Sequence, residues 1–195
     1  MWLVDGELRV AHDLVDARPG RTLESAYLDP LADIVRANRG WVYPARTAPV
    51  QLLVDIKSAA EPTWLALEKA LVDYRPMLTR FGPHGASAGA VEVVVSGNRP
   101  RELMAGELVR WSAYDGRLGD LGGPDAEPGF MPLVSDRWTG TFTWAGVGPM
   151  PADEAARLAR IVATAHGDGQ RVRFWATPDS PGPARDAVWA RLLDA

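Results

Sequence analysis

The sequence has no cysteine, which excludes disulfides, thiolate metal sites and a cysteine nucleophile. It has no cluster of lysine and arginine either, and its formal net charge is −4. A chain without a basic face is not expected to bind nucleic acid. No apolar run approaches the roughly 20 residues that span a bilayer. The first residues lack the basic and then apolar layout of a signal peptide. The chain as written is expected in the cytoplasm. The alternative of a longer gene product with a signal peptide stays open.

The composition that remains is that of an ordinary globular protein. The chain has 195 residues, of which 47% are hydrophobic and 24% charged, so one domain over residues 1–195 is the simplest expectation. Apolar strand-like runs alternate with longer helical patterns, which predicts βαβ units and a parallel sheet. Strands are predicted over 2–4, 8–11, 50–57, 91–97, 110–114, 133–136 and 171–176, helices over 22–35, 63–78, 99–108, 153–166 and 184–193, and loops over 82–89 and 119–132.

The predicted strand over 50–57 ends with an acid and a base two positions apart, Asp55 and Lys57. Successive strand residues point to opposite faces, so these two share a face. The rest of the run is apolar, as in a parallel strand covered by helices. Charges at its carboxyl end fall where α/β proteins carry their sites. The residues alone leave two interpretations equally open, an ion pair that caps the strand or part of a functional site.

Two further polar clusters follow predicted strands, His12-Asp13 and Trp175-x-Thr177. Together with the strand and helix alternation, the three clusters resemble the phospholipase-C-like phosphodiesterase barrels, the superfamily of glycerophosphodiester phosphodiesterases and spider-toxin sphingomyelinases. A closer resemblance, to bacterial relatives of the altered-inheritance-of-mitochondria proteins, covers nearly the whole chain. It is carried by residues 2–8, 11–13, 22–25, 27–30, 96–100, 114–117 and 173–178.

The resemblance implies a (β/α)8 TIM-barrel-like parallel barrel and a metal-assisted phosphoric diester hydrolase acting on a small or lysophospholipid-like phosphodiester. Asp55 would bind a divalent cation, Mg2+ or Ca2+, because both prefer carboxylate oxygen. Lys57 would hold a phosphate oxygen and neutralise its growing charge. His12 would transfer protons, for which imidazole is suited near neutral pH. Trp175 would line the substrate pocket.

Some parts of the family pattern are missing from the sequence. The first strand with its catalytic histidine, the Glu-x-Asp that opens the second strand, and the last strand have no counterpart. We therefore expect an incomplete barrel, a partial domain cut at both ends. Missing strands leave unpaired edges, and Asp55 alone supplies few metal ligands. The alternative function is a non-catalytic or inactive barrel fragment, and the sequence does not indicate an oligomeric state.

For four further residues, the sequence allows two interpretations each. Asp13 orients the His12 ring or caps a turn. Ser96 lines the mouth of the barrel or belongs to an ordinary turn with the Gly and Asn that follow it. Asp115 and Arg117 contact substrate or form an ion pair that closes a loop.

Overall fold

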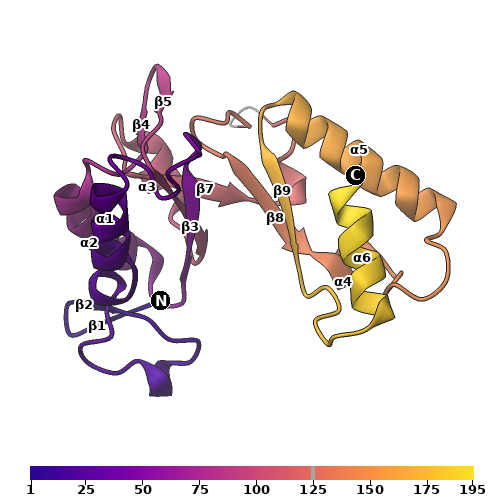
Figure 1. Cartoon of the computed structure of the whole chain (residues 1–195), viewed down its shortest axis with the longest axis horizontal. Helices are drawn as coiled ribbons and strands as arrows, with labels where there is room; N and C mark the ends of the chain where they lie inside the picture. Colours follow the sequence, from indigo (N-terminus) through magenta and orange to yellow (C-terminus); the bar gives the residue numbers. More distant parts are fainter. Residues whose placement is uncertain (124–125) are drawn as a thin grey trace. The chain divides into compact units, whose positions relative to one another are not determined.

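The computed structural model describes residues 1–123 and 126–195, and the chain divides into two compact units (Figure 1). The first unit is Met1–Tyr114 and the second is Asp115–Ala195. Part of the predicted loop over 119–132, residues 124 and 125, lies outside the described residues.

The first unit opens with a hairpin and continues with parallel strands and helices. The hairpin turns at Asp5 and Gly6, whose φ angles of 51° and 82° are those of the tight turn that fits strand twist. The elements are β1 Trp2–Val4, β2 Glu7–Arg9, the short turn η1 Leu14–Asp16, η2 Glu24–Leu28, α1 Asp29–Ala37, β3 Val50–Ile56, α2 Ala60–Leu71, η3 Val72–Tyr74, β4 Arg80–Gly82, β5 Gly85–Ser87, β6 Val91–Gly97, α3 Arg101–Gly106 and β7 Ser112–Gly116. The last two residues of β7 belong to the second unit.

Strand β3 pairs in parallel with β6 along its whole length, from Val50 opposite Val91 to Ile56 opposite Gly97. Strand β6 also pairs in parallel with β7. Val54 and Ile56 of β3 and the valines of β6 are buried, as are Trp64 and Leu67 of α2, which agrees with a parallel strand that a helix covers. The hydroxyl of Ser112 accepts the indole N–H of Trp64 (3.1 Å), which joins α2 to β7.

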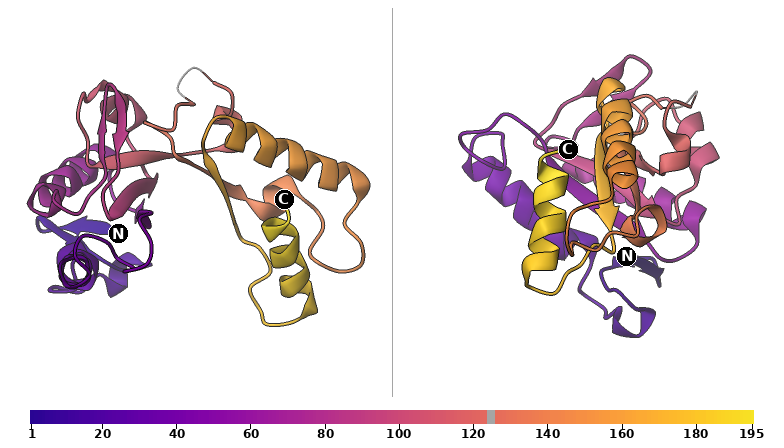
Figure 2. Two further views of the ribbon diagram at one scale, coloured as in Figure 1. Left: turned by 45° about the horizontal axis from the view of Figure 1, so that its top comes forward. Right: turned by 90° about the vertical axis from the view of Figure 1, so that its right-hand side faces the viewer.

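The second unit contains η4 Leu118–Asp120, β8 Leu133–Arg137, α4 Trp138–Thr141, α5 Ala152–Gly167, β9 Arg171–Trp175 and α6 Pro183–Leu193. Strand β8 pairs in parallel with β9 and with the last two residues of β7. Figure 2 shows α5 and α6 on the same side of β9. Trp138 is the centre of the core there, with its ring 4.4 Å from the ring of Phe142 and 5.4 Å from that of Phe174.

The prediction of a TIM-barrel fold is wrong. The described residues form one parallel sheet of five strands in the order β3-β6-β7-β8-β9, and its end strands do not pair with each other. The two segments at the start of the chain, β1 and β2, pair antiparallel with each other instead of joining that sheet. The fold is a mixed α/β fold with an open parallel sheet and two small hairpins.

Two local predictions also needed correction. The helix predicted over 63–78 begins at Ala60 and ends at Leu71, followed by the tighter turn η3. The loop predicted over 82–89 instead contains the turn of a hairpin. Strands β4 and β5 pair antiparallel, and a turn of two residues joins Gly82 to Gly85. Gly85 has φ +97°, a conformation that favours glycine.

Candidate functional site

Asp55 and Lys57 form an ion pair at the carboxyl end of β3. The distance between Asp55 Oδ2 and Lys57 Nζ is 2.8 Å. The Asp55 side chain is 46% exposed and that of Lys57 is 35% exposed, so water screens the pair and its net contribution to stability is at most about 1 kcal/mol. An ammonium group that is held in place but still reaches water is available to bind an anion.

The end of β6 holds the end of β3. The side-chain amide of Asn98 donates to the carbonyl oxygens of Lys57 (3.2 Å) and Ser58 (3.0 Å), and its backbone N–H donates to Ile56 O (2.8 Å). Gly97 has φ +73°, and a Cβ there would overlap with Asp55 Oδ1 and Ile56 O. Only glycine lets the Asp55 carboxylate occupy its position beside β6.

His12 lies just after the hairpin, with its side chain 86% exposed. Its Nδ1 is 3.2 Å from Asp13 Oδ1, and its carbonyl oxygen accepts the indole N–H of Trp2 at 3.4 Å. A carboxylate beside Nδ1 favours the tautomer whose proton is on that nitrogen. The other ring nitrogen, Nε2, then carries the lone pair and faces away from Asp13 as an acceptor.

A hollow of about 230 Å³ brings His12, Asp55 and Lys57 together. These residues come from two segments more than forty positions apart in sequence, and the fold of the first unit places them along one surface. The polar residues lie among apolar neighbours. The hollow is lined by Met1, Val10, Ala11, His12, Leu23, Tyr27, Leu52, Leu53, Val54, Asp55 and Lys57.

The other predicted residues do not line this hollow. Ser96 is buried and pairs along the sheet with Asp55. Trp175 belongs to the second unit, where its ring is 41% exposed and lies 5.7 Å from the Arg137 guanidinium.

Asp115 and Arg117 form an ion pair with each other, which is one of the two interpretations that the sequence left open. Asp115 is fully buried and its Oδ2 lies 3.0 Å from Arg117 Nη1. The same guanidinium nitrogen donates to Gly116 O (2.8 Å), and the Arg117 N–H donates to Asp120 Oδ2 (2.7 Å). An ion pair therefore closes the loop after β7.

A divalent cation would find few protein ligands here. No group of three or more His, Asp or Glu side chains suited to a metal occurs among residues 1–123 and 126–195. Among the described residues, Asp55 is the one carboxylate that lines the hollow, and it is paired with Lys57. Mg2+ can use one or two carboxylates, with water and substrate phosphate completing its shell. The described side chains alone do not fit a closed metal site.

Two carboxyl groups away from the hollow have shifted pKa values. Burial raises the pKa of Glu68 in α2, against hydrogen bonds from the Ser112 hydroxyl and the Trp111 N–H. In the second unit, hydrogen bonds from the hydroxyl (2.6 Å) and the N–H (2.8 Å) of Thr143 lower the pKa of Glu154.

Sequence reasoning missed the positioning role of Gly97 and Asn98, because glycine and asparagine are also ordinary turn residues. Their place directly after the strand next to β3 was the available signal. It also missed Tyr27, which lines the hollow and is 43% exposed. The sequence predicted only that Tyr27 belongs to the helix over 22–35.

The fold and the hollow define an α/β protein whose charged residues gather at the carboxyl end of a parallel strand, the place where α/β proteins bind ligands. The family model described as AIM6-like phosphodiesterase domain matches residues 1–115, more than half of the chain. The chain belongs to this family.

A curated relative agrees with the family match. The chain is 25% identical over 213 residues to the "Altered inheritance of mitochondria protein 6 homolog" of Arthroderma benhamiae. The match covers 98% of the chain and 66% of that protein, so the chain spans slightly less than two thirds of the relative's length. A comparison with solved structures finds no significant match.

Proposed function

We propose that this protein is a phosphoric diester hydrolase of the glycerophosphodiesterase and phospholipase-C-like type, with its site in the hollow of the first unit. The observation that carries the proposal is the placing of His12, Asp55 and Lys57 along one hollow. All three lie within residues 1–115, the part that matches a phosphodiesterase domain.

Each residue has a chemical task in this proposal. The Lys57 ammonium binds a nonbridging phosphate oxygen and offsets the charge that grows there as the nucleophile attacks. Asp55 holds that ammonium at 2.8 Å. His12 transfers a proton to or from the attacking or departing oxygen, with Asp13 beside Nδ1 to orient the ring. The apolar wall, which includes Leu23 and Leu53, suits the carbon part of a small or lysophospholipid-like phosphodiester.

The cation requirement is part of the proposal. A divalent ion, Mg2+ or Ca2+, would have Asp55 as its one carboxylate ligand in the hollow, and when bound it would supply further positive charge to the phosphate. Such a site would depend on substrate to complete its shell. The proposal therefore expects weak cation binding without phosphodiester and stronger binding with it.

Hydrolysis of a bis-aryl phosphodiester with added Mg2+ or Ca2+ tests the proposal. We expect turnover that EDTA abolishes, and a loss of about a hundredfold in His12→Gln, the usual size for a proton-transfer group. His84→Gln is the matched control, because His84 is an exposed histidine in the β4–β5 turn. Equal turnover in His12→Gln and His84→Gln would contradict the assigned role of His12.

A second candidate function is a phosphate-binding domain without catalysis. The observation that favours it is the lack of a three-ligand metal group among the described side chains. In that case phosphodiester would bind to wild type and less tightly to Lys57→Ala, with no turnover under any cation condition. Isothermal titration beside the turnover assay separates the two functions.

A further inference from the structure

Residues 10–21 form a compact loop that begins at the hollow. The N–H of Val10 donates to Arg21 O (2.9 Å), and Arg9 and Thr22 form an antiparallel bridge, so the two ends of the loop lie side by side. The Arg9 guanidinium also donates to Ala17 O (3.4 Å). Loops of this length with joined ends pack as units on the surface.

The outer turn of this loop exposes two adjacent apolar side chains. Turn η1 spans Leu14–Asp16, and the N–H of Ala17 donates to Leu14 O (3.0 Å). Leu14 is 55% exposed and Val15 is 88% exposed. Scattered exposed apolar residues are normal, but a neighbouring pair at the tip of an anchored loop is a local apolar surface.

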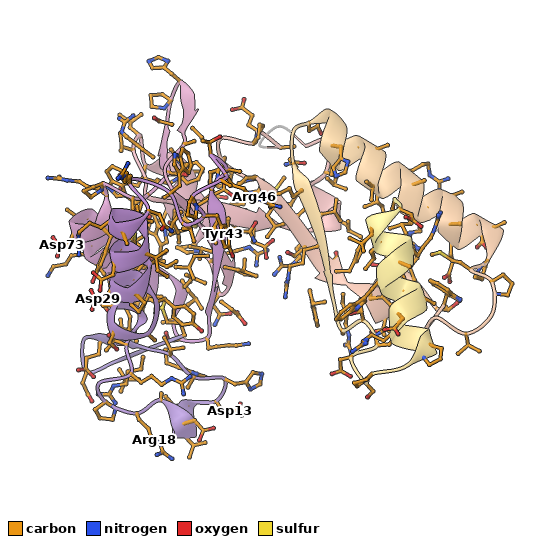
Figure 3. The ribbon with its side chains drawn as sticks, viewed as in Figure 1. Asp13, Arg18, Asp29, Tyr43, Arg46 and Asp73 are labelled. Atoms are coloured by element: carbon orange, nitrogen blue, oxygen red, sulfur yellow. The ribbon has the colours of Figure 1, made fainter. Side chains whose placement is uncertain are left out.

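Two arginines follow this apolar tip in the loop, and Asp13 and Asp16 stand directly before and after the tip. Arg18 and Arg21 line a hollow of about 460 Å³ together with Val10, Ala11, His12 and Asp16. Of the described residues, no carboxylate forms an ion pair with either guanidinium. Figure 3 shows Arg18 and Asp13 at the outer end of the same loop.

We propose that residues 10–21 dock this protein on a phospholipid surface. Leu14 and Val15 enter the boundary between headgroups and acyl chains, as the apolar residues of interfacial segments do. Arg18 and Arg21 bind lipid phosphates, whose oxygens match the planar guanidinium. The overall charge of −4 gives no general attraction to such a surface, and within the loop Asp13 and Asp16 balance the two arginines. Binding therefore depends on the apolar tip and on direct contacts between guanidinium and phosphate groups.

The position of His12 connects the docking loop to the proposed site. His12 lines both the hollow that contains Lys57 and the hollow that contains Arg18. A loop docked through its tip holds the first unit with both hollows close to lipid headgroups. The docking itself does not depend on hydrolysis, so either proposal can fail alone.

Sedimentation with vesicles tests the docking. The vesicles are phosphatidylcholine with about 30% phosphatidylglycerol, an anionic lipid that attracts surface arginines. We expect wild type to sediment with them and the double variant Leu14→Ser, Val15→Ser to bind about tenfold more weakly, from the loss of apolar contact. The matched control is Leu108→Ser, Val147→Ser, which removes apolar residues that are 75% and 79% exposed elsewhere.

The arginines are tested in the same assay. Arg18→Gln and Arg21→Gln are each expected to weaken binding about fivefold, with Arg46→Gln, another exposed arginine, unchanged. Circular dichroism checks that all variants fold. Wild type that stays in the supernatant, or loop variants that bind as well as their controls, would overturn the docking proposal whatever the phosphodiesterase assay shows.

Discussion

Replacing Gly97 by alanine tests how the end of β6 positions Asp55. The φ of +73° by itself costs an alanine about 1–2 kcal/mol. The added Cβ would also overlap with Asp55 Oδ1 and with the backbone oxygen of Ile56. A backbone oxygen in a paired strand cannot turn away as a flexible side chain can, so we expect a further loss of about 2 kcal/mol from this crowding.

The control is Gly20→Ala, at φ +78° with no atom within 4 Å of the added Cβ. Urea unfolding of both variants separates the cost of φ from the cost of the contact. We expect Gly97→Ala to lower the free energy of unfolding by about 3–4 kcal/mol and Gly20→Ala by about 1–2 kcal/mol. Equal losses would refute the claim that a Cβ at position 97 is crowded by the end of β3.

Three further outcomes are expected. Asn98→Ala should lower the free energy of unfolding by about 1–2 kcal/mol in urea, because the carbonyl oxygens of Lys57 and Ser58 lose their donor; an unchanged midpoint would contradict this. Because burial raises the pKa of Glu68, the stability of the protein should fall as pH rises from the ordinary pKa of glutamate through the raised pKa. Glu68→Gln should remove this fall in a plot of unfolding free energy against pH. Because hydrogen bonds lower the pKa of Glu154, this residue should stabilise the protein at pH values above the ordinary pKa of glutamate, and the stabilisation should disappear as pH falls through the lowered pKa. Melting temperatures measured over a pH series test this, and the same decrease at acid pH in wild type and Glu154→Gln would disprove it.

Local patterns in the sequence predicted the elements that carry the site. The apolar run that ends in Asp55 and Lys57 forms β3, and the short runs over 2–4 and 8–11 form β1 and β2, because strand formation here depends on neighbouring residues. The sequence also left open whether the two charges form an ion pair or part of a site. The structure shows the ion pair and places it in a hollow with His12.

The TIM-barrel-like fold was predicted wrongly, even as an incomplete barrel, because the arrangement of strands in a sheet is not a local property. Whether β3 pairs with β6 and whether the end strands of the sheet meet depends on pairings between distant segments, which the alternation of strands and helices does not specify. The contact between Gly97 and Asp55 was hidden for the same reason. Each residue is ordinary in its own segment, and only the register between β3 and β6 gives it a role.

The two lysines of the chain allow the most direct test of the proposed site. Lys57 lines the hollow, and Lys69 is exposed near the end of α2. The measurement is kcat/KM for a bis-aryl phosphodiester with Lys57→Met and Lys69→Met. The account predicts a loss of about a hundredfold or more for Lys57→Met, as for other groups that stabilise transition-state charge, and no change for Lys69→Met. Equal activity of the two variants would contradict it.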